Sequence, residues 1–265
     1  MSADRPGILE VQDLSLRFGG VVALNDVSFS IGRGSISAII GPNGAGKTTI
    51  FNCISRMCAP DRGRILFKGE DLLELRPHDV ALRRIARTFQ NPELFSRMTT
   101  LDNLLLGRHS HMTVGLVGAA THSPETIREE LRHREQVERI IEFLRLQPAR
   151  HRIVADLPFG TRKLVELGRA LAMEPELLML DEPSAGMNPE EKQDLRLWLQ
   201  DIRHDLGITI LLVEHDMSMV MQISDTVLAF NDGQKIAEGP PEEIRTHPEV
   251  VRAYLGDDAQ GADDP

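Results

Sequence analysis

The chain of 265 residues is 41% hydrophobic and 26% charged, an ordinary composition for a globular protein with one large core or two modest ones. Its 40 acidic residues outnumber its 30 basic ones and give a formal net charge of −10. This balance argues against a nucleic-acid partner, because a phosphate backbone is neutralised by clustered Lys and Arg. No apolar run approaches the roughly 20 residues needed to span a bilayer, and the first residues lack the apolar core of a signal peptide. Any work at a membrane is therefore expected to proceed through a partner.

The chain opens with a pattern of strands. Apolar and polar side chains alternate across residues 8–18 and again across 27–31, and this period of two predicts half-buried strands. Glycine pairs mark turns at 19–20 and 32–34, and the short apolar run 36–40 predicts a buried strand. Because strands come first, we expect the N-terminal part to be partly antiparallel.

The next segment, residues 41–48, reads GPNGAGKT and matches the phosphate-binding loop G-x-x-x-x-G-K-[ST] at every fixed position. It follows a predicted strand and precedes a helix-forming run, so a chance glycine-rich turn is the weaker alternative. Glycines let the backbone wrap a phosphate, and the loop N–H groups and the positive end of the helix would face the anion. Lys47 is expected to reach the β- and γ-phosphates, and the Thr48 hydroxyl to ligate Mg²⁺. The predicted nucleotide-binding set of this region comprises Gly41, Pro42, Asn43, Gly44, Ala45, Gly46, Lys47, Thr48 and Thr49.

Two cysteines, Cys53 and Cys58, lie on or just after the helix predicted behind this loop. Their spacing fits no zinc site. We expect them to be reduced thiols of a cytosolic protein, without a part in the chemistry.

The middle of the chain changes from strands to helices. We interpret about residues 91–159 as a helical subdomain inserted into a sheet domain. The predicted elements are a turn at 60–63, a strand at 64–68, a helix from Pro77, an extended segment at 85–89, helices at 102–106 and 124–146, and a loop at 109–123.

The last third alternates helices and strands, which is typical of a largely parallel sheet. Residues 256–265 are acidic and lack apolar anchors, so we predict a disordered tail there. The predicted elements before this tail are helices at 163–173, 189–206 and 217–224, buried strands at 177–180 and 208–213, a hairpin at 226–230 and 234–238, and helices at 241–246 and 248–255.

Two carboxylates follow the apolar run 177–180. A strand buried on both faces would deliver Asp181 to its carboxyl end, where ligands collect in open α/β sheets. We expect Asp181 to hold Mg²⁺ through water and Glu182 to orient and polarise the attacking water. A strand followed by a polar turn is the alternative, and the phosphate loop in the same sheet argues against it.

A series of motifs then resembles the ATP-binding subunits of ABC transporters over roughly residues 8–255. The resemblance implies an α/β fold with a P-loop NTPase (RecA-like) mixed sheet core, an N-terminal antiparallel β-subdomain and an inserted α-helical subdomain. Residues 8–90 and 160–255 would form the core of this single ATPase domain. The motifs are, in order, GPNGAGKT, Gln90 after a strand, LPFGTRKLVELGRAL at 157–171, LLMLDEP at 177–183, SAGMNP at 184–189 and His215 after a strand.

The same resemblance implies roles for single residues. Phe18 falls where the family places an aromatic that stacks on adenine. Gln90 matches the glutamine that senses Mg²⁺ and water at the γ-phosphate, and His215 the histidine that contacts this phosphate. Lys47, Gln90, Glu182 and His215 are thus the predicted catalytic residues, and Thr48, Gln90 and Asp181 the predicted metal ligands. Asn188 stands where the family usually has Asp, which puts any charge-dependent role of this loop in doubt.

The segment Leu157-Pro158-Phe159-Gly160-Thr161 matches the family's signature loop, commonly LSGGQ, with three departures. Pro158 replaces the serine that donates to the γ-phosphate, and proline has neither hydroxyl nor N–H. Our hypothesis is that the Gly160 backbone, the following helix end and the Thr161 hydroxyl bind the partner's nucleotide. A degenerate signature that completes a slow site is the alternative.

Further motifs resemble the branched-chain amino-acid and amide (urea-type) importer subgroup, which pairs two different ATPase subunits with two membrane subunits. This implies an ATP hydrolase that uses ATP and Mg²⁺ and dimerises around two ATP, with a second ATPase subunit, integral membrane permease subunits and, indirectly, a solute-binding protein. It would lie at the cytoplasmic face of the inner or plasma membrane. A soluble, non-transport ABC-type ATPase acting on a macromolecule is the alternative. The motifs are RTFQNPELF at 87–95, FNCI at 51–54, the loop from Gly115 to Gly118, EHDM at 214–217 and RAYLG at 252–256.

Overall fold

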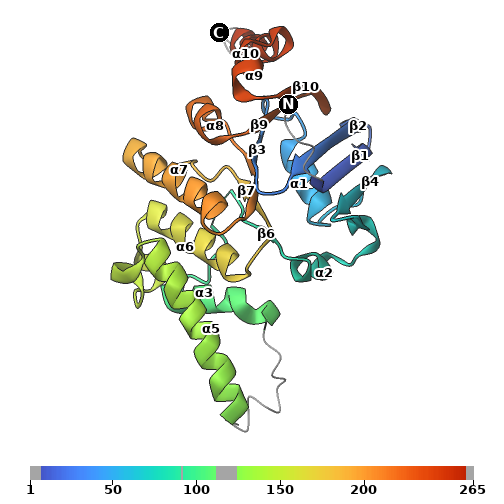
Figure 1. Ribbon diagram of the computed structural model, residues 1–265. Coiled ribbons are helices and arrows are strands. Elements are labelled where there is room, and N and C mark those ends of the chain that lie inside the picture. Colours follow the sequence, from blue (N-terminus) through green and yellow to red (C-terminus); the bar gives the residue numbers. More distant parts are fainter. Residues whose placement is uncertain (1–6, 91, 112–123, 261–265) are drawn as a thin grey trace.

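The computed structural model describes residues 7–90, 92–111 and 124–260, which form two sheets with helices packed around them (Figure 1). The first sheet is antiparallel and has the strand order β2-β1-β4-β5. Its strands are β1 (Gly7–Phe18), β2 (Val21–Gly32), β4 (Arg62–Phe67) and β5 (Glu70–Asp71). The predicted antiparallel β-subdomain is therefore present.

The second sheet has the order β10-β9-β3-β8-β7-β6. Neighbours from β9 to β6 run parallel, and β10 pairs antiparallel with β9 at one edge. Parallel strands end at the same edge of a sheet, so the segments after β3, β6, β7 and β8 lie near one another. The strands are β3 (Ile36–Ile40), β6 (Ile85–Arg87), β7 (Leu177–Asp181), β8 (Thr209–Val213), β9 (Thr226–Asn231) and β10 (Gln234–Gly239).

The central strands are apolar throughout because both of their faces are covered. In β7, Leu178 and Leu180 belong to the core beneath the helices, whereas Leu177 and Met179 belong to the core shared with the antiparallel sheet. Every residue of β3, β7 and β8 is buried. This is the arrangement expected for parallel strands with layers on both sides.

Helices lie on both sides of the larger sheet. Figure 1 places α1 and the antiparallel sheet on one side, α6, α7 and α8 on the other, and α3 and α5 beyond α6. The helices are α1 (Lys47–Ile54), α2 (Pro77–Leu82), α3 (Thr100–Gly107), α5 (Pro124–Phe143), α6 (Phe159–Ala172), α7 (Pro189–His204), α8 (Met217–Ile223), α9 (Pro241–Thr246) and α10 (Pro248–Gln260).

Several element bounds differ from the predicted ones. Helix α6 begins at Phe159 instead of Lys163; Pro158 is its N-cap, and the Pro158 carbonyl accepts the Arg162 N–H at 3.0 Å. Helix α10 continues to Gln260, into the segment predicted as a tail, and residues 261–265 lie outside the described residues. A short 3-10 helix, Arg108–His111, opens the predicted loop 109–123, whose residues from 112 onward also lie outside the described residues. These differences leave the predicted fold class intact.

Candidate active site

The phosphate loop, residues 41–46, connects β3 to α1. Gly41, Gly44 and Gly46 have φ angles of 151°, 83° and 95°, a region that disfavours residues with a side chain. A Cβ on Gly46 would lie 2.7 Å from the Ala23 carbonyl oxygen, and one on Gly41 would collide with the Phe230 carbonyl oxygen. Both conformation and space therefore require glycine at Gly41 and Gly46.

Lys47 is the first residue of α1 and is buried. Its Nζ donates to the carbonyl oxygens of Gly41 and Pro42, each at 2.7 Å, so the ammonium lies inside the loop that the motif predicts to hold phosphate. Thr48 is exposed in the first turn, where no acidic residue or side-chain cap offsets the positive end of the helix. The helix end is thus suited to an anion.

Three of the predicted catalytic residues meet at the Glu182 carboxylate, which contacts Gln90 and His215. Its Oε2 accepts a hydrogen bond from Gln90 Nε2 at 2.8 Å, and its Oε1 lies 3.0 Å from His215 Nε2. Its φ of 49° turns the chain sharply just after β7. The backbone is held on both sides, because its N–H donates to Val213 and its carbonyl accepts from Lys163 Nζ at 2.9 Å each. Gln90, Glu182 and His215 follow β6, β7 and β8, as their places after strands predict.

Asp181 ends β7 and is 4% exposed. Its Oδ2 accepts a hydrogen bond from Arg87 Nη2 at 3.0 Å. The sequence singled out Arg87 only as one letter of a motif and did not predict this contact. A parallel register that sets Arg87 of β6 opposite Met179 of β7 makes it possible.

Glu214 is a further residue that the sequence did not assign. It is buried, and its Oε1 accepts the Ser184 backbone N–H at 2.8 Å while its Oε2 accepts the His215 N–H at 3.1 Å. Its carboxylate therefore joins the loop after Glu182 to the loop that carries His215. The run Glu214-His215-Asp216 after a buried strand was the only signal.

The signature segment lies at the start of α6. Leu157 is buried, Pro158 is the N-cap, and Thr161 is half-buried in the first turn. Phe159 packs on Gly186, where an added Cβ would lie 2.8 Å from its Cε1, and Gly160 is so close to Glu191 that a Cβ would collide with the carboxylate. The segment is thus fitted against the 184–191 region of its own chain.

Phe18 ends β1 beside the turn to β2 and is 54% exposed, so it is not a core residue. The same hairpin reaches the phosphate loop, since Ala23 of β2 bounds Gly46. An exposed aromatic on this hairpin is compatible with the predicted stacking on a base.

The predicted metal ligands, Thr48, Gln90 and Asp181, supply hydroxyl, amide and carboxylate oxygens, which suit Mg²⁺. Within the described residues no cluster of three or more His, Cys, Asp or Glu is arranged to hold a metal by itself. Mg²⁺ is commonly held by one or two protein groups together with substrate phosphates, and these residues fit that mode.

The sequence model described as "ABC transporter" matches residues 24–185, which include the phosphate loop, Gln90 and Glu182. The chain belongs to the ABC transporter family. A second model, described as "Branched-chain amino acid ATP-binding cassette transporter", matches residues 234–260. This match covers β10, α9 and α10.

Curated relatives cover nearly the whole chain. The high-affinity branched-chain amino acid transport ATP-binding protein BraF of Pseudomonas aeruginosa is 40% identical over 250 residues, 94% of this chain and 98% of the relative. LivG of Escherichia coli, described in the same words, is 39% identical over the same shares. A probable LivG of Archaeoglobus fulgidus is 36% identical over 94% of this chain and 95% of its own.

Solved structures agree with this family. A nucleotide-free ATP-binding cassette from an ABC transporter has a TM-score of 0.81 and 34% identity, covering 94% of this chain and 98% of its own. The ADP conformation of an ABC transporter cassette has a TM-score of 0.80 and 32% identity, covering 94% and 99%. The predicted fold class and the ATP-hydrolysing activity of this ABC-type cassette are confirmed. The relatives are transport proteins, which favours the transport prediction over the soluble alternative.

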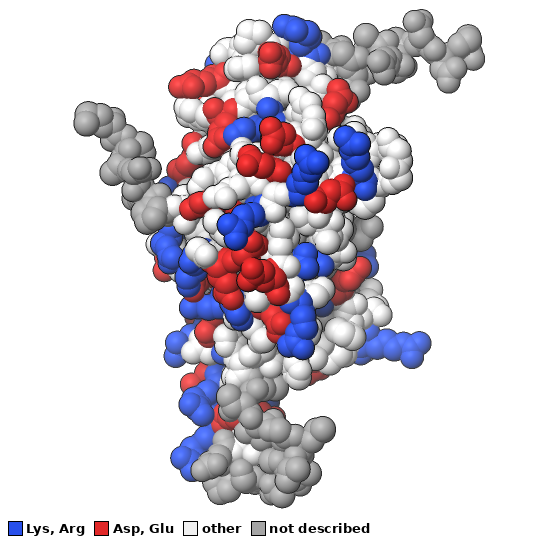
Figure 2. Space-filling model, turned by 90° about the vertical axis from the view of Figure 1, so that its right-hand side faces the viewer, with Lys and Arg blue, Asp and Glu red and all other residues white. Residues whose placement is uncertain are grey.

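The described residues contain no helix that is both long and apolar enough to cross a membrane. Figure 2 shows one face on which acidic and basic side chains are interspersed, without a continuous basic surface among the described residues of that face.

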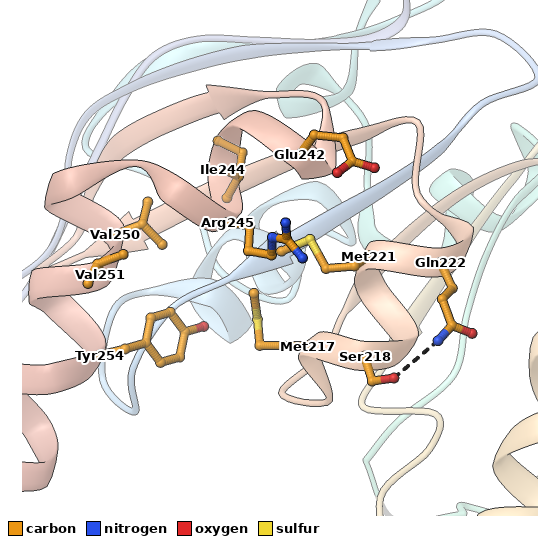
Figure 3. Close-up of a pocket in the computed structure, with 10 residues that line it drawn as sticks. All are labelled: Met217, Ser218, Met221, Gln222, Glu242, Ile244, Arg245, Val250, Val251 and Tyr254. Carbon is orange, nitrogen blue, oxygen red and sulfur yellow. Dashed lines mark hydrogen bonds between the residues drawn. The ribbon is translucent and has the colours of Figure 1, made fainter.

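A separate cavity of about 610 Å³ lies among α8, α9 and α10. Figure 3 shows Met217 and Met221 of α8 facing Val250 and Tyr254 of α10, with Arg245 of α9 between them. None of the predicted nucleotide or catalytic residues lines this cavity.

Proposed function

We propose that this chain is the ATP-hydrolysing subunit of a membrane importer for branched-chain amino acids or related amino acids and amides. The observation that carries the proposal is the Glu182 carboxylate, held between Gln90 and His215 at the sheet edge that bears the phosphate loop. The substrate class rests on the relatives, which are named for branched-chain amino acid transport, and on the match at residues 234–260.

Residues 41–49 bind the nucleotide phosphates in this proposal. The buried Lys47 ammonium lies against the loop carbonyls, from where it reaches the β- and γ-phosphates. The N–H groups of the loop and the positive end of α1 complete the anion site. The exposed Phe18 ring stacks on the adenine, since stacking requires only a flat aromatic face.

Thr48, Asp181 and Gln90 would hold Mg²⁺ together with the phosphates. When bound, the ion neutralises the charge that develops on the transferred phosphoryl group. Arg87 leaves one oxygen of Asp181 for this purpose, because its hydrogen bond goes to Oδ2. The carboxamide of Gln90 is likewise divided, with Nε2 directed to Glu182 and the oxygen left for the metal or for water.

Glu182 orients the attacking water and accepts its proton as the bond from the water oxygen to the γ-phosphorus forms and the bond to the β,γ-bridging oxygen breaks, so that ADP leaves. Gln90 and His215 each contact one of its oxygens, so both help to fix the direction of the carboxylate. His215 is exposed toward the site, and in the proposal it also contacts the γ-phosphate.

The signature segment would complete the nucleotide site of a second ATPase subunit. Gly160 and Thr161 lie in the first turn of α6, where the helix dipole favours an anion, and Pro158 offers no side-chain hydrogen bond. We infer a hetero-dimer, in which this non-standard segment faces a different subunit. A slow second site is the competing interpretation, and mutation of Thr161 and Gly160 tests it through ATP-driven dimerisation.

Family membership implies membrane permease partners and association with a membrane. We propose that contact with these subunits places the chain at the cytoplasmic face of the inner or plasma membrane. A solute-binding protein would deliver the amino acid or amide from the other side.

Replacement of Glu182 by Gln tests the catalytic role. In the fully assembled transporter we expect ATP to remain bound and the dimer to stay closed, while the rate of hydrolysis falls by about a hundredfold or more. Replacement of the exposed Glu142 of α5 by Gln is the matched control and should leave both unchanged. Rapid hydrolysis by Glu182→Gln would contradict the role of Glu182.

The transport proposal is tested by purifying the tagged chain from native membranes in mild detergent. We expect permease subunits and a second ATPase subunit to co-purify, and uptake of labelled leucine by cells to depend on Lys47. Co-purification with soluble macromolecules alone, together with unchanged leucine, amino-acid and amide uptake in the deletion strain, would favour the soluble alternative.

A further inference from the structure

We propose that Arg87 is a positioning residue for the metal site, because it ties Asp181 to the helix that carries Thr48. The inference rests on the proposed function, in which Thr48 and Asp181 hold Mg²⁺. It concerns the distance between these two groups, which come from different elements of the fold, α1 and β7.

The two arms of the Arg87 guanidinium reach different elements. Nη2 donates to Asp181 Oδ2 at 3.0 Å. Nη1 donates to Asn52 Oδ1 and to Ser55 Oγ, both at 2.8 Å, at the carboxyl-terminal end of α1. One rigid planar group thus sets the spacing between α1 and the carboxylate at the end of β7.

Three features of its environment hold the Arg87 guanidinium in place. The ion pair is desolvated, since the Arg87 and Asp181 side chains are 8% and 6% exposed. The rings of Phe51 and Phe89 lie 5.4 and 5.0 Å from the guanidinium carbon, within the range of a cation–π contact. Its positive charge also lies at the carboxyl-terminal end of α1, where a cation is favoured by the helix dipole.

Arginine is suited to this place in a way that lysine is not. A lysine ammonium is a point charge that can sit against Asp181 or against α1, but it lacks the planar fork that serves both at fixed separation. Groups that orient a metal ligand through a hydrogen bond affect metal affinity even though they do not touch the ion. We therefore expect Arg87→Lys to retain the fold and the charge but to loosen the metal site.

The experiment compares binding of a fluorescent, non-hydrolysable ATP analogue to the full chain in EDTA and in Mg²⁺. The ratio of the two dissociation constants reports how strongly the metal tightens nucleotide binding. For Arg87→Lys we expect the constant in EDTA to stay within about twofold of wild type, and the tightening by Mg²⁺ to fall about tenfold. Ser55→Ala, which removes one contact to α1 and keeps the ion pair, should reduce the tightening less.

Two controls separate the possible outcomes. Arg33→Lys changes an arginine that is 54% exposed in its ion pair with Glu176, and it should leave both constants unchanged. Asp181→Asn tests the metal role itself and should abolish most of the tightening by Mg²⁺.

Equal losses of affinity in EDTA and in Mg²⁺ for Arg87→Lys would overturn the inference, because a purely structural role does not discriminate between the two conditions. Wild-type behaviour of Arg87→Lys, alongside a clear effect of Asp181→Asn, would also overturn it and leave the proposed function standing. If Asp181→Asn binds as wild type does, the proposed metal role of Asp181 fails instead.

Discussion

The buried carboxylate of Glu214 accepts the backbone N–H of Ser184 at 2.8 Å. Ser184 follows Glu182 closely in the chain, and Glu214 immediately precedes His215, whose own N–H donates to the other oxygen. One side chain therefore fixes the two loops whose side chains meet at Glu182. The relative position of Glu182 and His215 depends on this link.

Replacement of Glu214 by Gln leaves a single side-chain oxygen to accept hydrogen bonds. One of the two backbone N–H groups, of Ser184 or of His215, then loses its acceptor. A buried N–H without an acceptor costs about 1–3 kcal/mol, so we expect the free energy of unfolding in urea to fall by that amount. Single-turnover hydrolysis should fall more than nucleotide affinity. The exposed Glu249 of α10, changed to Gln, is the control, and equal behaviour of the two variants would refute the link.

Gly186 is expected to resist substitution for two separable reasons. Its φ is 76°, and an added Cβ would lie 2.8 Å from Phe159 Cε1. Gly207 has a similar φ of 66° but nothing within 4 Å of the same position, so Gly207→Ala measures the backbone cost alone. We expect Gly186→Ala to lower the free energy of unfolding by more than about 1 kcal/mol, and by more than Gly207→Ala does. Adding Phe159→Ala should recover the excess, and no recovery would mean that the ring is not in contact.

The buried carboxyl group of Glu166 should make the free energy of unfolding depend on pH. Burial raises the pKa of this carboxyl above its ordinary 4.5, although the Phe89 backbone N–H and the charge of Arg169 oppose the shift. Because the folded pKa exceeds the unfolded one, the contribution of Glu166 to stability is complete below about 4.5 and is lost as pH rises through the folded value. Glu166→Gln stays neutral, so its stability relative to wild type should increase between pH 5 and pH 8. Urea unfolding of both proteins across this pH range measures the difference in their free energies of unfolding. A difference that does not change with pH would contradict the prediction.

The cysteines are expected to differ in reactivity. The Sγ atoms of Cys53 and Cys58 lie 3.4 Å apart, and burial raises the pKa of the Cys53 thiol strongly. Cys58 is only half-buried. In the folded protein iodoacetamide should modify Cys58 well before Cys53, as mass spectrometry can follow, and in urea both should react alike. Equal rates in the folded state would show that Cys53 is not protected.

Asn188 caps α7, and its replacement by Asp should be tolerated. Its Oδ1 accepts the Glu191 N–H at 2.9 Å, and Glu191 Oε2 accepts the Asn188 N–H at 2.9 Å. Asn and Asp are equivalent caps, so Asn188→Asp should leave the free energy of unfolding nearly unchanged, whereas Asn188→Ala should lower it by about 1 kcal/mol. A large loss with Asp would mean that the added charge, and not the cap, governs this loop.

The meeting of Gln90, Glu182 and His215 could be predicted because each follows a strand of one parallel sheet, and parallel strands end at the same edge. The phosphate loop was predictable for a local reason, since its glycine spacing determines its backbone. The start of α6 was misplaced because Gly160 and Thr161 are weak helix formers, although both lie in the first turn of the helix.

The contacts of Arg87 and Glu214 could not be predicted in the same way. Each depends on distances between elements that are far apart in the chain: 94 residues separate Arg87 from Asp181 and 30 separate Glu214 from Ser184. The contacts of Arg87 depend on the register of β6 against β7 and on the position of α1. The contact of Glu214 depends on how the loops after β7 and β8 lie against each other.

The atoms nearest to two glycines of the phosphate loop are main-chain carbonyl oxygens, and the Leu24 side chain also lies beside Gly46. Gly41 abuts the carbonyl of Phe230 on β9, and Gly46 abuts the carbonyl of Ala23 on β2. A different side chain at Phe230 or at Ala23 leaves the carbonyl oxygen of that residue in place. Insertion or deletion of one residue in β2 or β9 would move these oxygens. The loop should therefore tolerate side-chain changes at Ala23 and Phe230 better than insertions or deletions in β2 and β9, and variation in the length of these strands should be selected against more strongly than variation at those two positions.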